Sequence, residues 1–99
     1  MALRVKVSAR AASQIRKAAE WWADNRPAAP GAVRMDIGEA LALRAQQPGF
    51  GTTYEGARTK SVRRLLVGRI RHYIYYRVTA DALEVLAVWH VSRGKQPTL

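Results

Sequence analysis

Residues 62–94, VRRLLVGRIRHYIYYRVTADALEVLAVWHVSRG, are the most informative part of this chain. It contains three segments rich in β-branched and aromatic residues: 62–67, 69–79 and 82–91. The breaks between them, Gly68 and Ala80-Asp81, are short, as is typical of the turns that join strands into hairpins. The stretch therefore predicts three consecutive antiparallel strands, a meander that also carries many Arg and Tyr residues.

Side chains alternate between the two faces of a strand, so residues 69–79 separate into two sets. The first set is mostly apolar and is expected to pack on helices: Ile70, His72, Ile74, Tyr76 and Val78. The second set is expected on the opposite face: Arg69, Arg71, Tyr73, Tyr75 and Arg77. Guanidinium groups interleaved with phenol rings suit phosphate binding, base stacking or docking on an acidic protein. The alternative is an ordinary solvent-exposed strand face.

The last segment of the meander, residues 82–91, is apolar on both of its faces. Simple alternation gives the two sets Leu83, Val85, Ala87 and Trp89 on one face, and Leu86 and Val88 on the other. Such a strand is expected to be central in its sheet or covered on both sides. If the chain itself does not fill the second face, an apolar surface remains for a partner, such as the helix of a binding protein.

The N-terminal quarter of the chain predicts a strand followed by a helix. Residues 3–7 alternate apolar and basic side chains, and Ser8 offers a helix N-cap. Residues 9–25 then place apolar side chains at helical spacing: Ala12, Ile15, Ala19 and Trp22. Adjacent helical residues point about 100° apart. Trp22 is therefore expected in the core, and Trp21 at its flank or against a partner.

A second helix is expected after the prolines at positions 27 and 30. It is predicted to start near Ala28 or Pro30 and to end at Gln47-Pro48-Gly49. One apolar residue in every four marks its buried side: Val33, Ile37, Leu41 and Ala45. A polar loop, residues 48–61, leads from this helix to the meander. The expected fold is α+β in the order β-α-α-β-β-β, with the helical hairpin on one face of the sheet. The first strand is expected to run antiparallel to the second or the fourth strand.

Composition narrows the possible functions. The length of 99 residues and the hydrophobic content of 48% are sufficient for one domain, residues 1–99, with its own core. The absence of Cys excludes disulfides, thiolate zinc sites and cysteine nucleophiles, and two His are too few for a His-only metal site. No cofactor and no membrane contact are expected, and the chain is expected to be cytoplasmic.

Charge points to the kind of partner. The chain has 17 Lys and Arg against 7 Asp and Glu, a net charge of +10. This excess favours a polyanionic partner, which can be a nucleic acid, an acidic protein or a nucleoprotein machine. A basic surface that serves solubility is the alternative.

The whole chain resembles the RelE/ParE superfamily of bacterial type II toxins. The resemblance rests on the element order, on the Pro-Gly after the second helix, and on the segments VRRLLV, RHYIYYRV and LAVWHVSRG. It implies a small basic toxin held inactive by a cognate acidic antitoxin, with promoter DNA bound only through the antitoxin complex. RelE-like members cleave mRNA on the ribosome, whereas ParE-like members inhibit DNA gyrase without a reaction of their own.

The RelE-like nuclease pattern is incomplete in this sequence. Arg63 or Arg64 matches the basic position of the second strand, and Arg93 matches the arginine after the last strand. Where RelE-like enzymes carry a third-strand Arg, the alignment gives Tyr73, or Arg71 after a shift of one residue. The usual Tyr after Arg93 is absent. RNA cleavage needs several such groups around one phosphate.

The resemblance therefore implies a ParE-like toxin that binds DNA gyrase and is not an enzyme. The residues expected to bind the target are Arg63, Arg64, Arg69, Arg71, Tyr73, Tyr75, Arg77 and Arg93. The alternative is a ribosome-dependent endoribonuclease, whose candidate residues are Arg63, Arg64, Arg71, His90 and Arg93. A third possibility is a simple DNA- or RNA-binding module.

Overall fold

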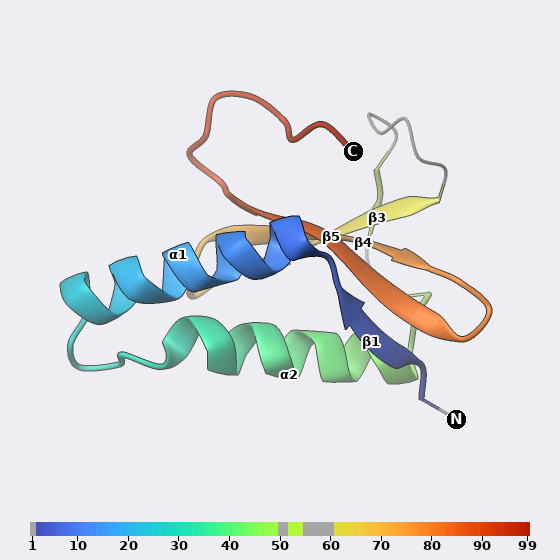
Figure 1. Cartoon of the computed structure of the whole chain (residues 1–99), viewed down its shortest axis with the longest axis horizontal. Helices are drawn as coiled ribbons and strands as arrows, with labels where there is room; N and C mark the ends of the chain where they lie inside the picture. Colours follow the sequence, from blue (N-terminus) through green and yellow to red (C-terminus); the bar gives the residue numbers. More distant parts are fainter. Residues whose placement is uncertain (1, 50–51, 55–60) are drawn as a thin grey trace.

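Two helices lie together on one side of a mixed β-sheet (Figure 1). The computed structural model describes residues 2–49, 52–54 and 61–99. The elements in these ranges are β1 (Arg4–Val7), α1 (Ala9–Asn25), α2 (Ala32–Gln46), β2 (Thr52–Thr53), β3 (Val62–Val67), β4 (His72–Val78) and β5 (Ala82–His90). The α+β class, the element order and the helical hairpin on one face are as the sequence predicts. The short strand β2 lies inside the segment expected to be a loop, of which residues 50–51 and 55–60 are outside the described residues.

The strand order across the sheet is β1-β5-β4-β3-β2. Strand β1 pairs with β5 in parallel, so the antiparallel pairing expected for the first strand is wrong. The reason is local, because a single residue, Ser8, separates β1 from α1. The chain therefore has no room to reverse there, and α1 continues in the direction of β1 (Figure 1). The chain runs back along the sheet in α2. The end of α2 lies beside the start of β1, where the Leu3 N–H donates to the Ala45 carbonyl at 2.9 Å.

Both helices bury a stripe of apolar side chains. In α1, the Ser8 hydroxyl accepts a hydrogen bond from the Ala11 N–H at 3.0 Å and so caps the helix. The buried residues of α1 are Ala11 and Ile15, so the stripe is shifted from the expected Ala12. Helix α2 starts at Ala32, later than expected, because both prolines lie in the turn before it. Its expected stripe is confirmed in full: Val33, Ile37, Leu41 and Ala45 are buried.

The helices and the sheet enclose the larger of two apolar clusters. The sheet side of this cluster is here called the helix-covered face, and its buried strand residues are Leu65, Val67, Ile74, Tyr76, Leu83, Val85 and Val88. The expectation that Ile70, Ile74 and Tyr76 pack toward the helices is confirmed. Among the residues that the structure describes, no helix is long and apolar enough to cross a membrane.

A bulge in β5 changes which residues face the helices. Consecutive residues Tyr75 and Tyr76 pair with Ala87 and Val85, so Leu86 is an extra residue in β5. After the bulge the alternation is reversed, and Ala87 and Trp89 lie on the opposite face from Leu83 and Val85. The single set expected from simple alternation is therefore wrong. The N-cap residue Ser8 and Gln14 of α1 bond the backbone of β5 beside the bulge: the Ser8 hydroxyl donates to the Leu86 carbonyl, and the Gln14 amide oxygen accepts from the Val88 N–H.

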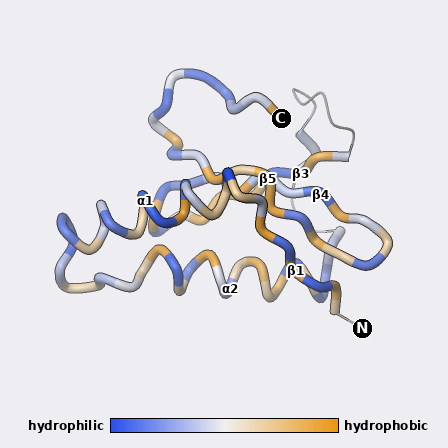
Figure 2. Tube along the Cα trace, in the orientation of Figure 1, coloured by the Kyte–Doolittle hydropathy of each residue, from blue (hydrophilic) through white to orange (hydrophobic). Residues whose placement is uncertain are grey.

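The second cluster lies on the other side of the sheet. Its buried members are Val62, Tyr75, Ala87 and Trp89, and this side is here called the tail-covered face. Residues 91–99, the C-terminal tail, cross it, and Leu99 packs against the cluster (Figure 1). Figure 2 shows a tail that is mostly hydrophilic and ends in an apolar residue. The chain thus supplies at least part of the second cover that an apolar β5 requires.

Candidate functional site

Hydrogen bonds fix the C-terminal tail to the aromatic side chains of the tail-covered face. The Trp89 indole N–H donates to the Lys95 carbonyl at 2.7 Å, and the Tyr75 hydroxyl donates to the Gln96 side-chain oxygen at 2.9 Å. Tyr75 also meets Tyr54 edge to face, with ring centroids 5.0 Å apart. Burial raises the pKa of Tyr75, and the nearby Arg64 partly opposes this. The tail is therefore held in a defined position on this face.

Arginines lie against aromatic rings on the same face. The Arg64 guanidinium is 4.2 Å from the centroid of the Tyr73 ring, and that of Arg93 is 3.6 Å from the Trp89 ring. Arg10 lies farther from Trp89, at 6.0 Å, and also donates to the carbonyl of Thr98. A guanidinium held over a ring keeps its charge and presents a flat, weakly hydrated cation, which suits carboxylates and phosphates.

The arginines expected on one face are divided between several places. Arg69 and Arg71 belong to the turn between β3 and β4, because Val67 pairs with His72 and the turn takes residues 68–71. Arg69 is bound to Asp36 of α2 through two nitrogens, an ion pair that raises the pKa of Arg69. Arg71 is exposed and adopts a left-handed backbone with φ of 54°. The prediction that both lie on the strand face beside Tyr73 is wrong.

Two further arginines of the expected set also have defined places. Arg63 pairs across the strands with Tyr76, on the helix-covered face, and donates to the Gly49 carbonyl at 3.3 Å. Arg77 lies on the tail-covered face, where it donates to one oxygen of Glu84 at 3.0 and 2.6 Å. The tail-covered face therefore keeps these members of the expected set: Arg64, Tyr73, Tyr75, Arg77 and Arg93.

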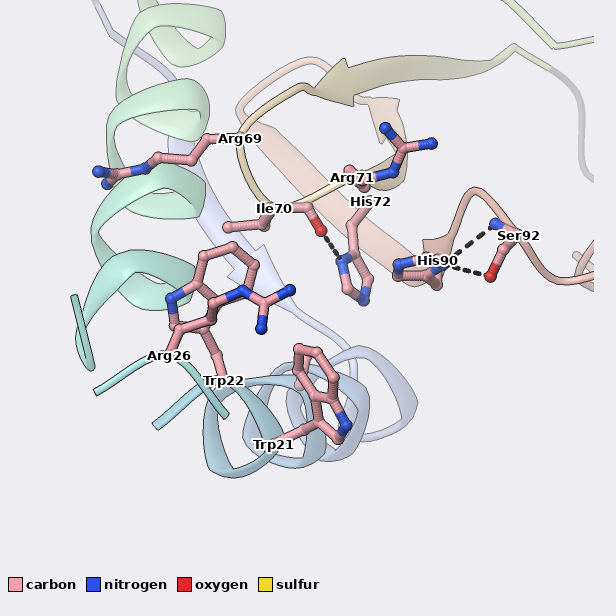
Figure 3. A pocket seen from close by; sticks show the side chains of 10 residues that line it. Trp21, Trp22, Arg26, Arg69, Ile70, Arg71, His72, His90 and Ser92 are labelled. Carbon is pink, nitrogen blue, oxygen red and sulfur yellow. Dashed lines mark hydrogen bonds between the residues drawn. The ribbon is translucent and has the colours of Figure 1, made fainter. Parts of the chain in front are cut away.

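A pocket of about 460 Å³ lies on the other side of the sheet, between α1, the 68–71 turn and the ends of β4 and β5. It is called here the indole–imidazole pocket, after the side chains at its centre: Trp21, Trp22, His72 and His90 (Figure 3). Arg26 extends between the two indoles, 5.5 and 5.9 Å from their centroids. Arg71 lies at the edge of the pocket, and its guanidinium points away from the indoles.

Hydrogen bonds with the backbone fix the tautomers of both imidazoles. His72 Nδ1 is 2.7 Å from the Ile70 carbonyl, which can only accept, so Nδ1 carries the proton and Nε2 of the neutral ring is an acceptor. His90 Nδ1 accepts from the Ser92 N–H at 3.0 Å, so its neutral ring carries the proton on Nε2. Burial lowers the pKa of His72, so the ring is neutral at pH 7.

The residues of the nuclease alternative do not converge. Arg64 and Arg93 lie on the tail-covered face, whereas Arg71 and His90 line the pocket on the other side of the sheet. Sequence reasoning did not foresee that His72 and His90 are cross-strand partners with perpendicular rings 4.9 Å apart. The available signal was that each lies at the outer end of its strand in the same hairpin.

These features define a small, strongly basic α+β protein with a sheet that carries stacked arginines. A family model described as "ParE toxin of type II toxin-antitoxin system, parDE" matches residues 5–94. The chain therefore belongs to the ParE toxin family. Among solved structures, it is similar to a chain of the "Chromosomal ParDE TA system from P. aeruginosa", with a TM-score of 0.74 and 22% identity over 91% of this chain and 97% of that one. No curated protein sequence matched significantly.

Proposed function

We propose that this ParE-type toxin acts by binding and inhibiting DNA gyrase, without a reaction of its own, and that a cognate acidic antitoxin neutralises it. The observation that carries the proposal is the division of the cationic residues between the two faces of the sheet. RNA cleavage requires a base, an acid and a charge-stabilising group around one phosphate, and the sheet separates the candidates for these roles.

The tail-covered face has the chemistry of a docking surface. Arg64 and Arg93 are held over rings, so they lose less side-chain freedom on binding than free arginines would. Tyr73 and Tyr54, which are only partly buried at the edge of this cluster, add the aromatic contact that protein interfaces favour. The net charge of +10 favours partners with acidic surfaces, which this proposal expects of the gyrase docking site and of the antitoxin. In this proposal, promoter DNA is contacted through the antitoxin.

The direct test is a supercoiling assay with purified gyrase. The protein is expected to inhibit at near-stoichiometric dose, and Arg64→Ala and Arg93→Ala are each expected to raise the required dose about ten-fold, as loss of an interface arginine does. Arg34 is an exposed arginine of α2, so Arg34→Ala is the matched control for charge and should leave the inhibitory dose unchanged. Co-expression of the antitoxin should restore growth. Codon-positioned cuts in ribosome-bound mRNA, with gyrase unaffected, would reject the proposal.

A further inference from the structure

We propose that the indole–imidazole pocket is a binding site for a nucleotide, that is, a flat nitrogen heterocycle carrying a phosphate. This site lies on the helix side of the sheet, away from the tail-covered face, and it does not depend on gyrase as the target. The source of the ligand can be a free nucleotide or the end of a single strand, since both present the same chemistry.

The walls of the pocket suit a flat ring. Trp21 is 53% exposed, a large indole that the fold leaves without full cover. Trp22 stands edge-on to it, with centroids 6.4 Å apart and planes inclined by 63°. Figure 3 shows the rings of Trp21 and His72 facing the same space. A nucleobase that stacks on Trp21 would cover this exposed surface.

The charge of the pocket suits a phosphate. Arg26 places its guanidinium between the indoles, and Arg71 is exposed at the edge of the pocket, where its guanidinium points away from the indoles and can meet only a part of the ligand that extends out of the pocket (Figure 3). Of the described residues that line the pocket, three are arginines and none is acidic. Arg69, the third, is already bound to Asp36. The Arg26 guanidinium donates one N–H to the Asn25 carbonyl at 3.0 Å, and its other N–H groups, together with Arg71 at the edge, are the phosphate ligands that this site offers.

The His72 ring adds a requirement that an anion alone does not meet. Its Nε2 is an acceptor, because the Ile70 carbonyl holds the proton on Nδ1, and it points toward Trp21 (Figure 3). A ligand that fills the pocket must bring a donor to this nitrogen or leave it unpaired. The amino and imino groups of nucleobases are such donors, at the edge of a ring that can stack. The pocket volume lies in the range of ligand sites.

The test is a titration of the full chain with AMP, followed by calorimetry and by quenching of tryptophan fluorescence. A Kd on the order of 0.1 mM is expected from one stacked base and one charge-assisted contact. Adenosine and inorganic phosphate should each bind about ten-fold more weakly, because each lacks one of these contacts. A 5′-phosphorylated oligo(dA) distinguishes the sources: tighter binding than AMP with the same dependence on Trp21 indicates a strand end, and weaker binding indicates a free nucleotide.

Variants locate the site. Trp21→Ala and Arg26→Gln should each weaken AMP binding about ten-fold, and Arg26→Lys should recover part of the loss. Arg34→Ala removes the same charge as Arg26→Gln at an exposed position of α2 and should change the Kd less than two-fold. Because Trp21 and Arg26 are exposed, all four variants are expected to fold, which thermal unfolding checks.

Three results would overturn the proposal. The first is equal weakening by Arg26→Gln and Arg34→Ala, which would reduce the binding to net charge. The second is AMP binding that Trp21→Ala leaves intact. The third is a ten-residue poly-glutamate peptide that binds more tightly than AMP and depends on Trp21, which would make this an acidic-peptide site. Gyrase inhibition can fail or succeed independently of all three.

Discussion

The two faces of the sheet bury apolar side chains in different ways. The helix-covered face is closed by two long helices, whose buried apolar stripes meet residues from three strands, β3, β4 and β5, in one cluster. The tail-covered face is smaller and is closed in part by a short tail, through hydrogen bonds to Trp89 and Tyr75 and the packing of Leu99. The difference separates two tasks. The first face holds the fold together, and the second keeps arginines and rings in place near the surface.

The largest effect is expected on the helix-covered face. Ile74→Ala removes a fully buried side chain from the main cluster and should lower the unfolding free energy by about 3 kcal/mol. Urea denaturation measures the loss. Leu99→Ala, on the other face, removes a partly buried terminal side chain and should cost about 1 kcal/mol or less. Equal losses from the two variants would show that the faces contribute alike.

Removal of the tail is expected to cost less than the core substitution. A chain that ends at Gly94 loses the partners of the Trp89 and Tyr75 side chains and the cover given by Leu99. Two hydrogen bonds from buried side chains and a partly buried leucine correspond to about 2 kcal/mol, and the bond from Arg10 to the Thr98 carbonyl, which is lost as well, lies at the exposed surface and adds little. Acrylamide quenching of tryptophan should increase, because Trp89 becomes accessible. Gln96→Ala is the control, since it removes one of the two bonds and keeps the backbone. A tail deletion that leaves both stability and quenching unchanged contradicts the structural role of the tail.

A pH dependence is expected from the pocket on the helix side. Burial lowers the pKa of His72 below its ordinary value of 6.5, so the unfolded chain binds this proton more tightly than the folded chain. The contribution of the neutral ring is therefore complete above pH 6.5 and is lost as the pH falls through the lower folded-state value. The slope for one proton cannot exceed about 1.4 kcal/mol per pH unit. Urea denaturation between pH 7.5 and 5 measures the change of the unfolding free energy with pH, and His72→Phe should make this change smaller. Identical pH profiles for the two proteins would contradict the assignment.

The smallest effect is expected in the 68–71 turn, which joins β3 to β4. Arg71 adopts φ of 54°, which glycine accepts without steric cost. Arg71→Gly should therefore raise the unfolding free energy by about 0.5 kcal/mol, after the greater freedom of glycine in the unfolded chain is subtracted. Thermal unfolding detects this change, and Arg71→Ala, which keeps the strain, should show no gain. A clear loss of stability in Arg71→Gly would mean that its side chain packs more than its exposure indicates.

Local patterns predicted the parts of the fold that depend on neighbouring residues. The cap at Ser8 and the α2 stripe follow from spacing along the chain, and both are confirmed. The direction of β1 and the β5 bulge were not foreseen. Each depends on residues distant in sequence: β1 lies against β5, and the backbone beside the bulge bonds to Ser8 and Gln14 of the N-terminal segment.

The candidate sites also have a part that the sequence predicted and a part that it did not. Residue types alone indicated an arginine and tyrosine surface, and Arg64, Tyr73 and Arg93 do lie together on the tail-covered face. Alternation placed Arg69 on that face as well, but a four-residue turn takes it to Asp36 of α2. Alternation is valid only inside a strand, and the sequence did not mark where β4 begins.

Composition and periodicity were enough to show a basic chain without cysteine, an amphipathic first helix, a second helix with one apolar residue in every four, and a meander whose last strand is apolar on both faces. The sequence also carried the family pattern. Three features appear only in the folded chain: the cations that share a face, the path of the tail across the sheet, and the meeting of His72 and His90 beside two indoles. The physical reason is that helical and strand periodicity are set by adjacent residues. The pairing of distant segments is set instead by the free energy of the whole packed chain.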